Sequence, residues 1–231
     1  MTAAAGQGGR RGVFMIMQLF EAKRRGFTFI EVMVVVVTIA LLAGVILPAF
    51  VPRRKTGGHR IHCVSNLKQI GLAMRMFSND HDDKFPWATP GAKGGSMEYS
   101  NSVEVFRHYL AVSNELTTPK VLLCPEETTR VRVNEWKDLS NTNISYFAGL
   151  DADEGKPNSL LSGDRTLSIG SNAWSGVMVI TGSSSLRVLP GLHANGINIG
   201  LGDGSAQQMT EQGIQKLISE MNELPVKVVV P

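Results

Sequence analysis

The chain has 231 residues, of which 43 % are hydrophobic and 19 % are charged. This composition excludes a disordered chain and fits one compact domain with an N-terminal extension. The first 26 residues contain five basic side chains and one acidic side chain, so the net charge of +3 leaves a slightly acidic remainder that does not suggest a nucleic-acid partner.

A long apolar stretch follows the basic leader. Residues 27–47, FTFIEVMVVVVTIALLAGVIL, contain 21 residues and one charged side chain, Glu31. As an α-helix they would span roughly 30 Å, the hydrocarbon thickness of a bilayer. A buried core helix would show a polar face, and a secretory signal peptide would be shorter and end in a small-residue cleavage site. The stretch therefore favours a transmembrane helix.

Basic residues flank both ends of this stretch, so the positive-inside rule does not set its orientation. The pattern Lys23-Arg24-Arg25-Gly26-Phe27-Thr28-Phe29-Ile30-Glu31 resembles the cleavage and methylation signal of type IV prepilins and type II secretion pseudopilins. The resemblance implies that a prepilin peptidase cuts after Gly26 on the cytoplasmic side and methylates Phe27. It also implies a leader over 1–26, an assembly helix over 27–47 and a periplasmic head over 48–231, carried by a single pass through the bacterial inner membrane.

Glu31 corresponds to the family's glutamate. An ionisable side chain at this depth costs roughly 2.5–3.5 kcal/mol on insertion scales, which makes it a functional candidate. The new α-amino group of Phe27 on a neighbouring subunit could pair with the Glu31 carboxylate during assembly. The alternative is that Glu31 reaches the membrane interface and has no partner.

A second amphipathic helix is expected to follow RRKTGGHR, residues 53–60, and to end at about Asn79. Its apolar stripe repeats at spacings of three and four residues and contains Cys63, Leu67, Ile70, Met74 and Phe77. Gly57 and Gly58 weaken the helix and favour a break or bend near them. The following residues, 80–100, have the composition of a loop.

The remainder of the chain predicts short strands and two short helices. A helix is expected over 102–112 with Ser102 as its cap, and another over 211–222 capped by Thr210. Gly202-Asp203-Gly204 predicts a hairpin turn. Strands are expected at 120–124, 143–149, 176–181, 197–201 and 205–209. Together with the prepilin resemblance, this order predicts an α+β, pilin-like fold in which a long N-terminal helix packs on an antiparallel sheet.

A second resemblance lies in the head. NLKQIGLAM at 66–74, Cys124-Pro125, SYFAGLDAD at 145–153 and GDR at 163–165 resemble prepilin-like proteins of planctomycete and verrucomicrobial type. His193, nine further residues and Asp203-Gly204 match the H-X9-DG processing-associated element of those proteins. The resemblance favours a type II secretion pseudopilus over a surface pilus, but it does not imply a role for this element.

Candidate chemistry is sparse. His193 and Asp203 could form a catalytic or metal pair, although Asp203 more simply bonds the backbone of its own turn. Asp151, Asp153 and Glu154 could bind calcium, the one cofactor considered, or form a solvated acidic turn. No other constellation indicates an enzyme. The main alternative function is a membrane-anchored periplasmic enzyme or ligand-binding module that uses a pilin-type anchor.

The two cysteines, Cys63 and Cys124, both follow the apolar stretch and would face the oxidising periplasm. Cys63 belongs to the apolar stripe, and Cys124 ends the apolar run KVLLC. If that run is a strand lying on the stripe, the sulfurs come within range of a disulfide. The alternative is a pair of buried free thiols.

Overall fold

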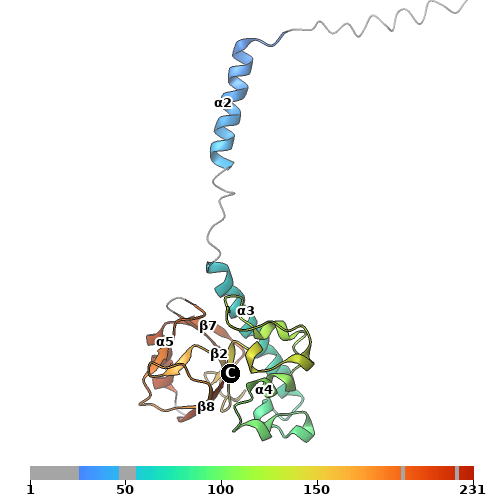
Figure 1. Ribbon diagram of the computed structural model, residues 1–231, viewed down its shortest axis with the longest axis vertical. Coiled ribbons are helices and arrows are strands. Elements are labelled where there is room, and N and C mark those ends of the chain that lie inside the picture. The colour runs from blue at the N-terminus through green and yellow to red at the C-terminus, as the bar shows by residue number, and fades with distance from the viewer. Residues whose placement is uncertain (1–25, 47–55, 194–195, 222–223) are drawn as a thin grey trace, which may run out of the picture. The chain divides into compact units, whose positions relative to one another are not determined.

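The computed structural model in Figure 1 describes residues 26–46, 56–193, 196–221 and 224–231. The chain divides into an N-terminal unit, residues 1–53, and a head, residues 54–231. The predicted leader up to Arg25 and the segment 47–55, with Pro48, lie outside the described residues. The expectation that the apolar helix and the second helix form one long helix depends on residues 47–55, which lie outside the described residues.

The described part of the N-terminal unit is the helix α2, Phe29–Ile46. Its 18 residues extend about 27 Å and are shorter than the 21-residue span expected. Within the described parts of the chain, no helix combines the length and the apolar character that crossing a membrane requires. Large apolar side chains are exposed around α2, among them Phe29, Ile30, Val34, Ile39 and Leu41.

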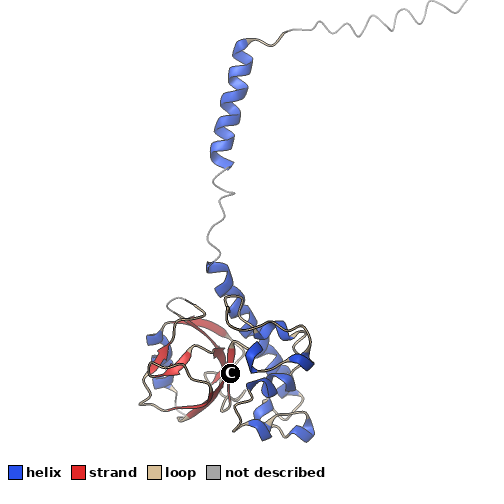
Figure 2. Ribbon diagram, viewed as in Figure 1, coloured by secondary structure: helices blue, strands red, loops and turns tan. Residues whose placement is uncertain are grey.

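The head is an α+β structure built on one antiparallel sheet (Figure 2). Its strand order is β4–β8–β1–β2–β6–β7. A separate pair, β3 (Leu167–Ile169) and β5 (Leu186–Val188), forms a small second sheet. In sheet order, the six strands span Gly176–Ile180, Val226–Val230, Tyr146–Gly149, Leu160–Asp164, Ile197–Leu201 and Ala206–Met209.

The strands β1, β2 and β6 are buried on both faces, so neighbouring residues of these strands enter different cores. In β1, Tyr146 points into one core and Phe147 into the other. The first core contains the stripe of helix α3, Thr56–Asn79, and the short helix α4, Val105–Ala111. The second core contains the buried face of α5, Glu211–Glu220, and the small sheet.

Helix α3 packs as its sequence predicts. All five stripe residues are buried, and α3 lies against β2, β6 and β7. The contact is close because small residues line it: a Cβ on Gly71 would lie 2.9 Å from the Cα of Gly204. Within the sheet, a Cβ on Gly200 of β6 would lie 2.7 Å from the hydroxyl oxygen of Ser162 on the paired strand β2.

Several sequence-based expectations for the elements are confirmed. The strands expected at 143–149, 176–181, 197–201 and 205–209 correspond to β1, β4, β6 and β7. Thr210 caps α5, since its side chain accepts the backbone N–H of Gly213. Strands β2, β3, β5 and β8 were not predicted.

Other expectations are wrong. Residues Pro119–Leu122 form the 3₁₀ helix η5 rather than a strand, because Thr118 accepts the N–H of Lys120 and Pro119 suits the first helical position. Gly57 and Gly58 lie inside α3, so no break occurs there. Glu104, rather than Ser102, occupies the position before α4. The loop 80–100 contains three further 3₁₀ turns, Pro86–Ala88, Gly91–Lys93 and Met97–Tyr99.

Candidate functional site

The predicted cleavage point lies just before α2. Phe27 is 87 % exposed, and a Cβ added to Gly26 would have no atom within 4 Å. Among the residues that the structure describes, no packing contact therefore requires glycine at position 26.

Thr28 and Glu31 form a capping box at the start of α2. The Glu31 carboxylate accepts the backbone N–H of Thr28 at 2.8 Å and its hydroxyl at 3.0 Å. In return, the Thr28 hydroxyl oxygen accepts the N–H of Glu31 at 3.3 Å. These bonds satisfy groups that a helix start leaves unpaired. The sequence signal for this capping box is Thr-x-x-Glu before an apolar run, and the charge of Glu31 alone does not predict it.

The two ends of the H-X9-DG element lie in different surroundings. Asp203 is exposed in the β6–β7 turn, where its carboxylate accepts the N–H of Ser205 at 2.8 Å. Gly204 has a φ of +81°, which glycine adopts readily, and its backbone touches Gly71 on α3. His193 is buried and touches the other predicted site, the cysteine pair. The structure therefore does not bring His193 and Asp203 together as a catalytic or metal pair.

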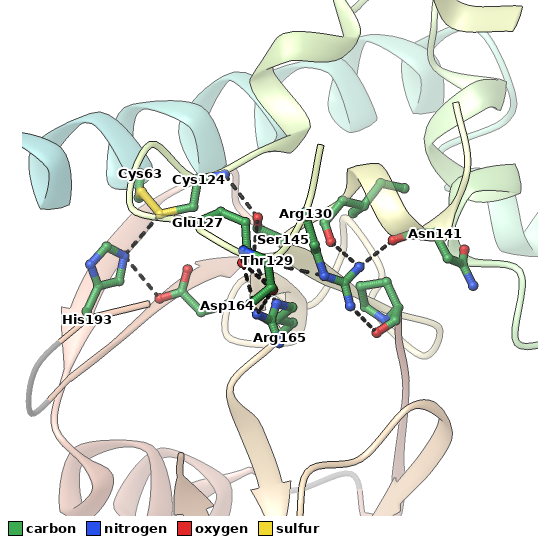
Figure 3. Close-up of polar contacts among 12 residues, drawn as sticks. Cys63, Cys124, Glu127, Thr129, Arg130, Asn141, Ser145, Asp164, Arg165 and His193 are labelled. Atoms are coloured by element: carbon green, nitrogen blue, oxygen red, sulfur yellow. Dashed lines mark hydrogen bonds and ion pairs between the residues drawn. A yellow bond between two sulfur atoms is a disulfide. The ribbon is translucent and has the colours of Figure 1, made fainter. Parts of the chain in front are cut away.

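His193 belongs to a buried cluster with Cys63, Cys124 and Asp164 (Figure 3). Its Nε2 atom lies 3.6 Å from the Cys124 sulfur and 3.7 Å from Asp164 Oδ2. Burial raises the pKa of Asp164 to about 7, although the N–H of Asn198 and the charge of Arg165 oppose the shift. Sequence reasoning missed Asp164, because its approach to His193 depends on the pairing of β2 with β6.

Cys63 and Cys124 form the disulfide that the sequence predicted. Their Cα atoms lie 5.5 Å apart, and the bond closes a loop across 61 positions of sequence. The element beside α3 is not the expected strand, because Cys124 follows the helix η5. The bond joins α3 to the segment that leads into the Glu127 network described next.

A charged network continues from this segment (Figure 3). Arg165 donates to both carboxylate oxygens of Glu127, at 2.8 and 3.1 Å. Burial alone would raise the pKa of Glu127, but hydrogen bonds from Arg165 and Thr129 and the charge of Arg165 lower it to about 2. Arg130 extends the network by donating to the carbonyl oxygens of Asn141, Ile144 and Pro231. These bonds connect the segment after Cys124 with the end of β2 and with the C-terminal residue Pro231, so the network has a structural role.

The three acidic residues considered for calcium have separate protein partners. Asp151 accepts the N–H of Lys227 at 2.6 Å, and Asp153 accepts the N–H of Gly155 at 2.8 Å. Glu154 pairs with Arg75 at 3.0 Å and also accepts the Ser78 hydroxyl. Their carboxylates thus act in turn and helix contacts, and the geometry does not converge them on one cation.

Comparison with known proteins identifies the N-terminal segment. Residues 22–47 match the family model of the prokaryotic N-terminal methylation motif, which covers Gly26, Phe27, Glu31 and all of α2. The match supports a prepilin-type protein and suggests membrane anchoring through this segment. No curated protein and no solved structure matches the chain.

Proposed function

We propose that the protein is a structural subunit of a pilus-like fibre, released from its leader and methylated by a prepilin peptidase. In this proposal the cut follows Gly26, Phe27 becomes the N-terminus, and the head faces the periplasm. The proposal rests above all on the methylation motif at residues 22–47.

The surface of α2 supports assembly. Side chains around this helix are exposed within the single chain: Phe29 is 82 % exposed and Leu41 is 67 % exposed. A helix that is apolar all round needs lipid or protein around it. In the proposed cycle, inner-membrane lipid covers α2 before assembly and other subunits cover it afterwards.

We assign Glu31 two consecutive roles. Within one chain, its carboxylate caps α2 through Thr28. After cleavage, the amine of Phe27 on a neighbouring subunit becomes available as an ionic partner, which offsets the cost of burying either charge. The predicted assembly role is thus compatible with the capping bonds.

Within this class we favour a type II secretion pseudopilus over a surface pilus. The support is the resemblance of the head to prepilin-like proteins with the H-X9-DG element. In the structure, the Asp203-Gly204 end of this element packs against Gly71 of α3. We propose that the element's role is to hold the sheet on the helix and that the protein is not an enzyme.

The alternative is a membrane-anchored enzyme or ligand-binding module. A cavity of about 830 Å³ gives it one supporting observation, since His193 lies at its wall. The other residue of the pair considered, Asp203, does not line this cavity. The proposed assembly function therefore has the better support.

Site-specific photocrosslinking tests the proposal. A photoreactive residue replaces Val34 on α2 in cells that contain a prepilin peptidase and a pseudopilus assembly system. We expect a ladder of crosslinked copies of this chain, and no ladder from the control position Lys216, which is exposed on α5 in the head. Mature chain in the membrane without crosslinks from position 34 would contradict the assembly function.

A further inference from the structure

The buried cluster around His193 has the composition of a metal site. Cys63, Cys124 and His193 each offer a ligand atom, and these three atoms lie within 4.8 Å of one another. Thiolate sulfur and imidazole nitrogen are the ligands that Zn²⁺ prefers in structural sites. Asp164 adds a carboxylate oxygen beside His193.

Two edges of a zinc tetrahedron can be compared with the structure. With Zn–N near 2.0 Å and Zn–S near 2.3 Å, ligand nitrogen and sulfur atoms are separated by about 3.5 Å. A nitrogen–oxygen edge is about 3.3 Å on the same basis. The corresponding distances from His193 Nε2 are 3.6 Å to the Cys124 sulfur and 3.7 Å to Asp164 Oδ2. The two sulfurs are joined in the disulfide and would separate on reduction, and Asp164 lies outside the group whose ligand atoms are all within 4.8 Å of one another, so it would have to move toward the sulfurs.

The surroundings of these side chains also point to a ligand. Asp164 is fully buried, and its Oδ1 atom has no hydrogen-bond partner among the described residues. On the other side of the imidazole ring, Glu126 Oε2 lies 3.9 Å from His193 Nδ1. A hydrogen bond from the second ring nitrogen to a carboxylate is one of the usual ways to orient a zinc-bound histidine, and a small movement of Glu126 would make this bond.

A cavity of about 830 Å³ borders the cluster and is lined in part by His193 and Glu126. Because the side chains of His193 and Asp164 are fully buried, a hydrated cation that approaches from the Glu126 side reaches the ligand atoms only through a local opening of the head. Removal of its water would leave the four side chains as its ligands.

We propose that the reduced form of the protein binds one Zn²⁺ through Cys63, Cys124, His193 and Asp164. A dithiol reductant opens the disulfide by supplying two electrons and two protons, and it becomes a disulfide itself. The two thiols then release these protons as their sulfurs bind the ion. The metal replaces the covalent link between α3 and the segment after η5. These two segments are therefore joined in both redox states, by the disulfide or by the ion. This inference does not depend on the assembly function.

Cobalt binding tests the site with the full-length protein. The protein is reduced with dithiothreitol, desalted under argon and titrated with Co²⁺, whose tetrahedral thiolate complexes absorb strongly. We expect one Co²⁺ per reduced chain, a sulfur-to-cobalt charge-transfer band, and displacement by one equivalent of Zn²⁺. The oxidised protein should show no such band.

Variants assign the ligands. His193→Ala should weaken Zn²⁺ binding by at least tenfold and alter the cobalt spectrum, and Asp164→Asn should weaken binding while retaining the sulfur band. His108→Ala, which removes a buried histidine elsewhere in the head, is the matched control and should bind as the parent does. Because each variant can still form the disulfide, thermal unfolding of its oxidised form shows whether it folds.

Two results would overturn the site. One is a reduced, folded parent protein that gives no sulfur-to-cobalt band. The other is a folded His193→Ala variant that binds Zn²⁺ with the parent's affinity and spectrum, because the ion would then be held by the cysteines without this cluster.

Discussion

The N-terminal helix and the head solve the problem of apolar surface in different ways. The head buries both faces of the strands β1, β2 and β6, with α3 on one side and α5 with the small sheet on the other. Helix α2 leaves apolar side chains exposed around its circumference. The head can therefore be stabilised by contacts within one chain, whereas α2 needs an environment outside it. Substitutions in the two regions should accordingly affect different measurements.

The largest effect is expected at the cleavage point. Gly26→Trp should abolish leader removal and hence assembly, because the family signal places the cut after this residue. The substitution meets no atom within 4 Å of its Cβ, so the melting temperature of the head should not change. Immunoblotting of cells that contain a prepilin peptidase measures cleavage. Efficient cleavage of the variant would show that the peptidase does not require Gly26.

A series at Glu31 separates the charge of α2 from its capping bonds. Glu31→Val removes both and should reduce assembled fibres at least tenfold while the chain still enters the membrane. Glu31→Gln retains a capping acceptor without the charge, and Thr28→Val retains the charge without the hydroxyl.

Fibre yield from sheared cells compares these variants. If the charge governs assembly, Glu31→Gln should resemble Glu31→Val, and Thr28→Val should assemble nearly as the parent does. The opposite ranking would show that the capping bonds, rather than an intersubunit ion pair, are required.

In the head, loss of the disulfide should give the largest change in stability. Cys63→Ala with Cys124→Ala removes a link across 61 positions, and chain-entropy estimates give about 4 kcal/mol for a loop of this length. The free energy of unfolding of the oxidised, metal-free protein is compared with that of the double variant by urea titration. Leader cleavage should be unchanged, since the link lies outside the N-terminal unit; equal stability of the two proteins would contradict this account.

A smaller and pH-dependent effect is expected from the Glu127 network. Glu127→Gln should lower the free energy of unfolding by about 2 kcal/mol at pH 7, because it weakens charge-assisted bonds to Arg165. The pKa of Glu127 in the folded protein is about 2, below its ordinary value of 4.5. Its contribution is therefore complete above about pH 4.5 and is lost as the pH falls toward 2.

Urea titrations from pH 7 to 2.5 measure this dependence. The stability difference between the parent and Glu127→Gln should narrow below pH 4.5. A difference that stays constant over this range would show that the carboxylate charge does not stabilise the fold.

Local patterns predicted those elements whose stabilising contacts are close in sequence. The stripe from Cys63 to Phe77 identified α3, and Thr210 identified the start of α5. The β6–β7 hairpin followed from Gly202-Asp203-Gly204. Strand β8 was missed because its place between β4 and β1 depends on residues more than 40 positions away. Apolar periodicity also failed at 120–124, where the local cap of Thr118 and Pro119 favours η5.

The candidate sites likewise differ in whether their residues are close together in the sequence. The cleavage and methylation signal is contiguous, so Gly26, Phe27 and Glu31 could be named from sequence. The cysteine pair could be inferred from a shared apolar environment. The convergence of His193 and Asp164 could not, because it arises from strand pairing, and the fixed spacing from His193 to Asp203 pointed to a different partner.

The central claim is that this chain is processed as a prepilin, and the mass of the mature protein tests it most directly. The full-length protein is produced with a prepilin peptidase, purified from the membrane fraction, and its N-terminal peptide is sequenced by mass spectrometry. The account predicts a chain that begins at Phe27 and carries one methyl group on its α-amino nitrogen. A protein that retains its leader, or that begins at another residue, would contradict it.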